Sequence, residues 1–278
     1  MGMWLRLSAV ILYVLLPFNS QADVENKVFT VGVVPQFEAA KLYQIWRPIL
    51  DQVEQKTGYR FKMRGSVSIP DFEREVLEGK FDFAYMNPYH MILAAEAAGY
   101  VPVIRDHGRK LYGVLVVRKD SEISKPEELN DKTLAFPSPN ALGASLQMRQ
   151  ELHDKFDVKV KPTYVRTHDS VYQNVLLRET SAGGGVQKTF NQQKPQYKEM
   201  LRVIHTTEKV NSHPFAAHAD VPEIIRDEIR TAFIELGKNN EGRKLLLKIP
   251  MKQVGVATIG DYQQLKPMRL ERFYVAPN

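Results

Sequence analysis

The feature that most constrains the fold of this chain is a regular alternation of β-branched runs and amphipathic stretches. Residues 28–34 form a continuous apolar run, Val-Phe-Thr-Val-Gly-Val-Val, of the kind that becomes a buried strand. Residues 39–56 follow with apolar side chains at helical spacing, and Gly58 ends that stretch. The same order of strand and helix recurs along most of the chain. Such repeated units predict an α/β fold with parallel, doubly wound sheets.

The alternation runs in two series, and this predicts two lobes. The first series pauses at two consecutive strand-like segments, residues 101–105 and 111–118, and a second series then begins. We expect the chain to cross between the lobes twice, through the extended runs 115–119 and 215–220. The predicted lobes are residues 23–114 plus 215–278, and residues 115–214. In this architecture a ligand binds where strands end and helices begin, and a cleft between two lobes can close by a hinge.

The first 22 residues have the pattern of a secretory signal peptide. Arg6 precedes the apolar run Leu7–Leu16, and Pro17 and small residues up to Ala22 follow. That apolar run is about half of the roughly 20 residues that a membrane-spanning helix needs, so we expect cleavage after Ala22. No later segment is long and apolar enough either, and no stable membrane insertion is expected.

Composition and motifs argue against several functions. The absence of cysteine excludes disulfides, thiolate metal sites and an N-terminal lipid anchor on cysteine. The net charge of +6 is dispersed along the chain without a Lys/Arg run, so no nucleic-acid partner is expected. The run Gly183–Gly185 is followed by Val186-Gln187-Lys188 and not by the Gly-Lys-Ser/Thr of a nucleotide-binding loop, which indicates instead a close backbone approach. The spacing of His205, His213 and His218 matches no metal motif, and we expect no metal and no cofactor.

Four short loops connect the end of a predicted strand to the start of a predicted helix. They are residues 35–38, 85–90, 136–145 and 167–170. Each helix start offers backbone N–H groups without partners and a partial positive charge, so together the loops predict a receptor for an anion. The alternative is structural. Asn87, Ser138, Asn140 and Asp169 are common helix caps, and Tyr85 and Tyr89 could be core residues.

Over residues 27–262 the chain resembles a known group of proteins in the order and spacing of its motifs. The segments that carry the resemblance are 31–35 (Val-Gly-Val-Val-Pro), Pro48, 79–85 (Gly-Lys-Phe-Asp-Phe-Ala-Tyr), 133–136 (Thr-Leu-Ala-Phe), 167–171 (Thr-His-Asp-Ser-Val), 182–184 (Ala-Gly-Gly) and 213–215 (His-Pro-Phe). The chain is similar to the type II periplasmic binding proteins, and within them to the phosphate, phosphite and phosphonate-binding components of ABC importers. The resemblance implies a periplasmic protein that holds an oxyanion between two hinged lobes. The missing cysteine, together with the signal peptide, predicts that this protein is not lipidated.

The resemblance also implies site residues. The tyrosine of the first helix is matched by Tyr43, the aromatic residue after the third strand by Tyr85, and the histidine that opens a helix of the second lobe by His168. A turn with Ser-Thr-Ser character falls on residues 140–143, where this chain lacks the hydroxyls and keeps the backbone N–H groups, with Ser138 or Ser145 nearby. The predicted ligand-binding residues are Tyr43, Tyr85, Asn87, Tyr89, Ser138, Asn140, Ala141, Leu142, Gly143 and His168. Ser181 stands where relatives usually carry an acidic residue, which disfavours an amine-bearing ligand.

These features favour a binding protein that delivers a small oxyanion to an ABC permease. Three alternatives stay open from the sequence. One is a sensor that presents its closed form to a membrane receptor kinase or cyclase, and another is a binder of an unrelated small solute. The third is an enzyme in which His168, oriented by Asp169, acts as a general base, although no nucleophile motif accompanies the pair.

Overall fold

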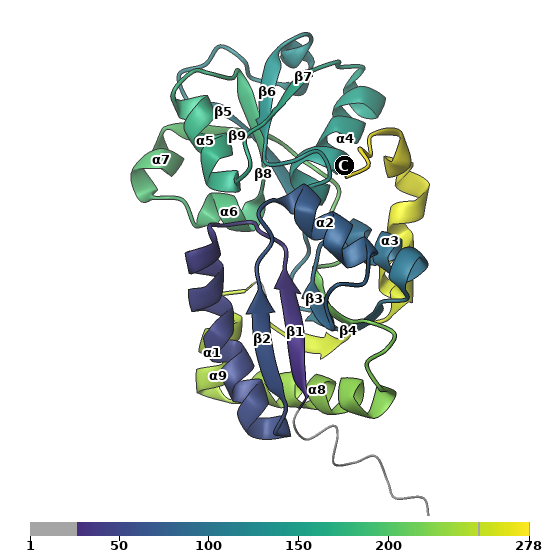
Figure 1. The fold of residues 1–278 in the computed structure, drawn as a ribbon. Coiled ribbons are helices and arrows are strands. Elements are labelled where there is room, and N and C mark those ends of the chain that lie inside the picture. The colour runs from purple at the N-terminus through teal and green to yellow at the C-terminus, as the bar shows by residue number, and fades with distance from the viewer. Residues whose placement is uncertain (1–26, 250, 278) are drawn as a thin grey trace, which may run out of the picture.

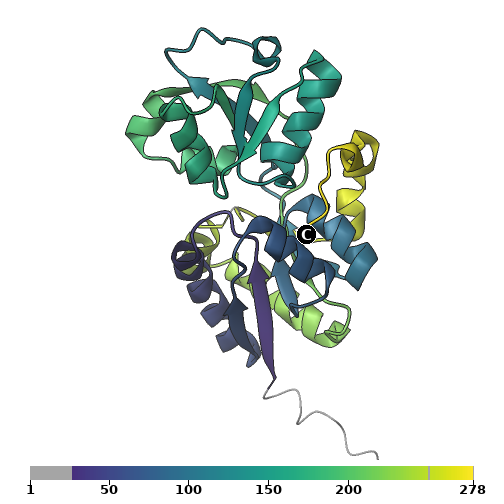
Figure 2. The same cartoon turned by 45° about the horizontal axis from the view of Figure 1, so that its top comes forward.

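The computed structural model describes residues 27–249 and 251–277, which form two β-sheets with helices packed on both faces of each (Figures 1 and 2). The predicted signal peptide, residues 1–22, lies outside the described residues. The predicted α/β fold with two sheets is confirmed. In the described part of the chain, no helix combines the length and the apolarity needed to cross a membrane.

The first sheet has six strands in the order β11-β4-β10-β3-β1-β2. Its strands are β1 (Val28–Val33), β2 (Arg60–Arg64), β3 (Phe83–Tyr85), β4 (Val101–Asp106), β10 (Pro214–Ala217) and β11 (Val254–Val256). Its helices are α1 (Ala39–Thr57), α2 (Ile69–Leu77), α3 (Pro88–Ala98), α8 (Glu223–Leu236) and α9 (Asn240–Leu246). β1 pairs in parallel with β2 and β3, whereas β10 pairs antiparallel with both β3 and β4. The sheet is therefore mixed, not parallel as predicted, because β10 enters it from the other lobe and not through a helical crossover.

The second sheet has five strands in the order β7-β6-β8-β5-β9. Its strands are β5 (Gly113–Arg118), β6 (Thr133–Phe136), β7 (Lys161–Tyr164), β8 (Ala182–Val186) and β9 (Leu201–Thr206). Its helices are η1 (Pro126–Leu129), the π-helix η2 (Leu142–Leu146), α4 (Gln147–Phe156), α5 (His168–Leu176), α6 (Gln187–Asn191) and α7 (Pro195–Glu199). Here too the sheet is mixed, because β5 pairs antiparallel with β8 and β9.

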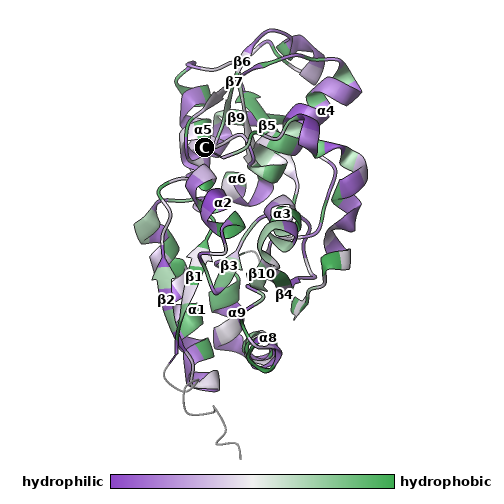
Figure 3. Ribbon diagram, turned by 45° about the vertical axis from the view of Figure 1, so that its right-hand side comes forward, coloured by the Kyte–Doolittle hydropathy of each residue, from purple (hydrophilic) through white to green (hydrophobic). Residues whose placement is uncertain are grey.

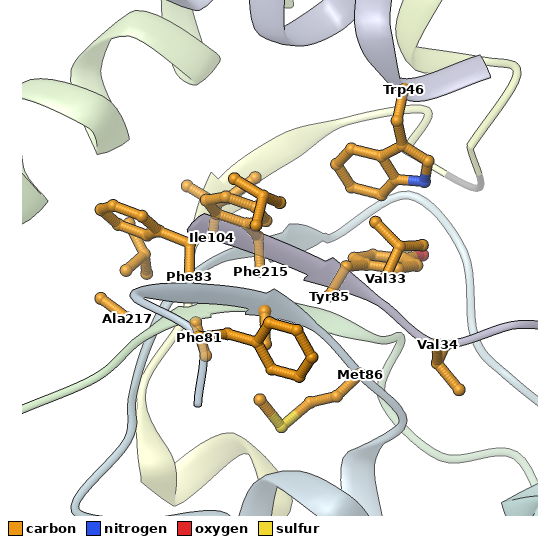
Figure 4. Packing of buried hydrophobic residues seen from close by; sticks show 14 of the residues in the cluster. Val33, Val34, Trp46, Phe81, Phe83, Tyr85, Met86, Ile104, Phe215 and Ala217 are labelled. Atoms are coloured by element: carbon orange, nitrogen blue, oxygen red, sulfur yellow. The ribbon is translucent and has the colours of Figure 1, made fainter. Parts of the chain in front are cut away.

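Aromatic side chains fill the core of the first sheet. Phe83 and Phe215 stack with ring centroids 5.5 Å apart, and Trp46 from α1 lies 4.8 Å from the Tyr85 ring on the same face (Figure 4). The alternation of Phe83, Ala84 and Tyr85 along β3 gives this face its rings. The figure shows Phe81 on the opposite side of the sheet from Trp46. Colouring by hydropathy shows apolar and polar residues alternating along the helices, as in amphipathic helices (Figure 3). This packing fixes the strand ends from which the site loops emerge.

Two short segments, residues 107–112 and 207–213, join the sheets. They lie side by side, since Leu111 and Val210 form an antiparallel bridge. The predicted crossing runs, 115–119 and 215–220, were misplaced. Their apolar parts lie inside β5 and β10, where they pair with neighbours on both sides. The division into a first lobe of residues 23–114 and 215–278 and a second lobe of 115–214 stays a proposal.

Two other elements differ from the prediction. The helix expected over residues 140–156 begins as the π-helix η2 and becomes regular only in α4. β11 was not predicted, because its three residues Val254–Val256 are too short to show a period.

The C-terminal segment connects the two lobes. After β11 the chain forms the 3-10 helices η3 (Ile259–Met268) and η4 (Leu270–Arg272), which Figure 1 shows in yellow beside α3. Arg149 of α4 donates to the carbonyl oxygen of Phe273 at 2.8 Å, and Arg272 pairs with Asp154 at 2.5 Å. The end of the chain therefore binds the second lobe from the side of α3.

Candidate functional site

A small cavity of about 20 Å³ lies where loops of both lobes meet. We call it the central pocket. Its lining residues are Val34, Gln36, Ile69, Asn87, Leu111, Ala141, Leu142, Gly143, His168, Val186 and His213. Among the described residues that line it there is no carboxylate, and the polar groups are amides, imidazoles and backbone. Five of the ten predicted site residues, Asn87, Ala141, Leu142, Gly143 and His168, are brought together here.

Asn87 reaches the central pocket because it caps α3. Its Oδ1 accepts from the backbone N–H groups of Tyr89 at 2.8 Å and His90 at 2.9 Å, and Pro88 occupies the first helical position. Its Nδ2 donates across the lobes to the carbonyl oxygen of Asn140 at 3.2 Å. The structural alternative for Asn87 is thus correct, and the side chain also joins the two lobes.

The second lobe contributes the start of η2 to the central pocket. The first N–H groups of this helix, from Leu142 onward, have no partner within the helix and point out of its first turn. Gly143 is also required by packing, since a Cβ on it would lie 3.0 Å from the backbone nitrogen of Gly113. Gly184 of β8 packs against the same turn, because a Cβ there would lie 2.1 Å from the carbonyl oxygen of Ala144. Of the run Gly183–Gly185, for which a close backbone approach was predicted, Gly184 shows it, whereas Gly183 and Gly185 lie closest to the side chains of Val171 and Tyr172.

His168 is the first residue of α5, which Thr167 caps by accepting from the backbone N–H of Ser170 at 3.1 Å. The imidazole is 2% exposed, and its Nδ1 has no hydrogen-bond partner in the described structure. Burial, together with nearby Lys188, lowers the pKa of His168 to about 4, against a smaller opposing effect of Asp169. At neutral pH the ring is uncharged, so it offers one N–H donor and one acceptor nitrogen.

His213 was not predicted as a site residue. It precedes β10, stacks on the Tyr85 ring with centroids 5.3 Å apart, and places Nε2 3.3 Å from the Gln36 amide nitrogen. Burial lowers the pKa of His213 to about 3, so this ring is neutral as well. The sequence placed His213 in the motif 213–215, but it could not tell that this side chain lines the central pocket.

The side chain of Asn140, a predicted ligand contact, forms its hydrogen bonds with protein atoms. Its Nδ2 donates to Glu73 Oε2 at 2.9 Å and to the carbonyl oxygen of Val275 at 2.6 Å, and its Oδ1 accepts from the Val275 N–H at 3.0 Å. With the bond from Asn87, these contacts join α2, α3, the second lobe and the C-terminal segment. We call Asn140, Asn87, Glu73 and Val275 the Asn140 seam.

The remaining predicted residues lie outside the central pocket. Tyr43 is 55% exposed and lines a larger cavity of about 600 Å³ between α1 and residues 165–170. Tyr85 is buried behind His213, and Tyr89 packs on Tyr274 with ring centroids 5.9 Å apart. Ser138 is buried with no partner for its Oγ within the described residues. Ligand contact by any of these four stays a prediction.

Comparison with known proteins gives the family. Residues 31–262 match the family model of the ABC transporter, phosphonate, periplasmic substrate-binding proteins. The phosphonates-binding periplasmic protein of Escherichia coli (strain K12) is 23% identical over 248 residues, which cover 83% of this chain and 72% of that protein.

Two solved structures share the fold. One is a binding protein component of an ABC phosphonate transporter from Pseudomonas aeruginosa, with a TM-score of 0.79, 19% identity and coverage of 90% of this chain and 89% of that one. The other is PhnD1 from Prochlorococcus marinus in complex with methylphosphonate, with a TM-score of 0.80, 15% identity and coverage of 90% and 99%. With its two-sheet fold and a match over most of its length, the chain belongs to the periplasmic substrate-binding proteins of phosphonate ABC transporters.

Proposed function

We propose that this protein captures a small oxyanion of the phosphate, phosphite or phosphonate class in the central pocket and delivers it to an ABC permease. The observation that carries the proposal is the lining of that pocket. Both lobes contribute hydrogen-bond donors to it, and no carboxylate among the described residues opposes an anion there. Membership in the phosphonate-binding family supports the same class of ligand.

The donors come from opposite sides of the pocket. Gln36 belongs to the first lobe, and His213, at the end of the joining segment 207–213, lies against it and against Tyr85. The first turn of η2 and His168 belong to the second lobe. Because the histidines are neutral, each can donate one hydrogen bond to the anion, and the backbone N–H groups at the start of η2 can donate others. A ligand that contacts both lobes at once favours the closed arrangement, since those contacts exist only there.

The size of the central pocket implies that the lobes separate to admit the ligand. A cavity of about 20 Å³ holds about one water molecule, which is less than a tetrahedral oxyanion occupies. Opening would break the bonds of the Asn140 seam and expose His168, and closure on the anion would restore the seam around a larger pocket. Binding and hinge motion are therefore coupled.

Isothermal titration calorimetry with phosphate, phosphite, methylphosphonate and sulfate tests the ligand class. We expect saturable binding of at least one of the three phosphorus oxyanions and a loss of affinity of about tenfold or more in His168→Ala. An exposed histidine on α4, His153, provides a matched control, because His153→Ala leaves the pocket unchanged. The absence of both heat and thermal shift with every anion would contradict the proposal. Uptake by the reconstituted cognate permease, with and without the binding protein, tests delivery.

A further inference from the structure

A second cavity, of about 500 Å³, adjoins the central pocket. The two share the lining residues Gln36, Leu111, Val186 and His213, so a ligand in one can extend into the other. We call this cavity the basic pocket. It lies against the start of α6 and the connecting segment 107–112. Its volume is within the usual range for small-molecule sites, whereas the central pocket is far below that range.

The charge of the basic pocket is positive. Arg109, Lys110 and Lys188 line it, and its described lining includes no Asp or Glu. Lys110 Nζ bonds the neutral Asn211 Oδ1 at 2.6 Å. Over residues 27–249 and 251–277, neither Arg109 nor Lys188 forms an ion pair. Three cationic side chains around one cavity, with no acidic residue to balance them, attract an anion into it.

Lys188 lines the basic pocket, and its charge acts on both histidines of the central pocket, because it lowers the pKa of His168 and of His213. Its ammonium lies 5.9 Å from the centroid of the buried Phe37 ring, on which Lys41 also lies, at 3.8 Å. Burial, with the positive charges of Arg109 and Lys41 acting in the same direction, lowers the pKa of Lys188 to about 7. An anion beside this lysine would relieve that repulsion.

We propose that the basic pocket binds a second anionic group of the ligand, so that the ligand is a phosphonate or phosphate ester with a further acidic group. The oxyanion would occupy the central pocket, and a carboxylate or second phosphoryl group would lie against Lys188 and Arg109. This inference rests on the proposed function of the central pocket. Ser181, whose missing carboxylate predicted a ligand without an amine, precedes β8 at the end opposite Val186 and lines neither pocket, so it does not bear on this inference.

Calorimetry with three matched ligands tests the proposal. Methylphosphonate has the phosphoryl group alone, phosphonoacetate adds a carboxylate, and 2-aminoethylphosphonate adds an ammonium group. We expect phosphonoacetate to bind about ten- to a hundredfold more tightly than methylphosphonate, as a charge-assisted contact would give, and aminoethylphosphonate to bind no better than methylphosphonate. Lys188→Gln and Arg109→Gln should each reduce the ratio of the two affinities. Lys194→Gln, which removes an exposed charge of the same lobe outside both pockets, should leave that ratio unchanged.

The outcomes separate the two proposals. If methylphosphonate binds but phosphonoacetate binds no better, or if its advantage survives both pocket variants, the second anionic subsite is wrong while the oxyanion site stands. If none of the three ligands binds, and neither phosphate nor phosphite does, the proposed function itself is wrong. Circular dichroism of each variant distinguishes loss of a contact from loss of the fold.

Discussion

The Asn140 seam and the basic pocket both adjoin the central pocket, but they differ in whether their polar groups have partners within the protein. In the seam, each atom of the Asn140 amide is bonded to protein, with partners on α2 and in the C-terminal segment. In the basic pocket, Arg109 and Lys188 have no ion-pair partner among the described residues. Buried polar groups that satisfy one another stabilise a structure, whereas groups left without partners cost stability and are available to a ligand. The seam thus holds the lobes together, and the basic pocket serves recognition.

The largest effect is expected from breaking the seam. Asn140→Ala removes the hydrogen-bond donor to the fully buried Glu73 and both bonds to Val275. We expect the free energy of unfolding to fall by about 2–4 kcal/mol, because a buried acceptor then loses its partner. Chemical denaturation measures the loss. Asn240→Ala, at an exposed position in α9, should cost less than about 0.5 kcal/mol. If the free energy of unfolding fell equally in the two variants, the hydrogen bonds of the Asn140 seam would not stabilise the fold.

Shortening the C-terminus tests the same seam by removing Val275, the partner of Asn140. A chain that ends at Phe273 lacks the two Val275 bonds to Asn140 and the packing of Tyr274 on Tyr89. We expect a loss of about 2 kcal/mol in unfolding free energy and faster hydrogen exchange in α3 and η2. A chain that ends at Ala276 keeps all three contacts and should match the parent. If both truncations behave alike, the segment does not tie the lobes together.

Asn140 and His213 show what the sequence could and could not predict. The strands and helices follow from local periods, and the caps at Asn87 and Thr167 follow from local residue types. The role of Asn140 depends on Glu73 and on Val275, which lies 135 residues away along the chain. The sequence around Asn140 therefore could not predict these hydrogen bonds. His213 was missed for a similar reason, since it reaches Tyr85 and Gln36 only because β10, which follows it, pairs with β3 from a distant part of the chain.

In the basic pocket, removal of an unpaired charge should stabilise the ligand-free protein. Lys188→Met keeps the apolar stem and removes the buried ammonium, so we expect the unfolding free energy at pH 7 to rise by about 1 kcal/mol while anion affinity falls. The pKa of Lys188 is about 7 in the folded protein and near its ordinary value, 10.5, when unfolded. Between these values the unfolded state binds more protons, so the stability of the parent rises with pH through this window. Lys188→Met should lack that rise, and thermal denaturation at pH 7 and pH 9 measures it. An unchanged slope would show that Lys188 is well hydrated.

The smallest expected effect is a pH dependence of binding. An anion beside Lys188 raises its pKa, so affinity should fall as pH rises above about 7 and the lysine of the free protein loses its proton. Lys188→Arg stays charged throughout. The ratio of parent to variant affinity for phosphonoacetate cancels the ionisation of the ligand, and we expect it to fall several-fold between pH 6 and pH 9. A constant ratio would place the anionic group away from Lys188.

The central claim is that the oxyanion lies in the central pocket, with Gln36 and His213 on one side and His168 and the first turn of η2 on the other. A crystal structure of the protein with methylphosphonate tests it most directly. The account predicts the phosphoryl oxygens within hydrogen-bond distance of His168 and of the backbone N–H groups of Leu142 and Gly143, with the central pocket enlarged around them. A phosphonate bound instead in the cavity lined by Tyr43, with His168 still without a partner, would contradict it.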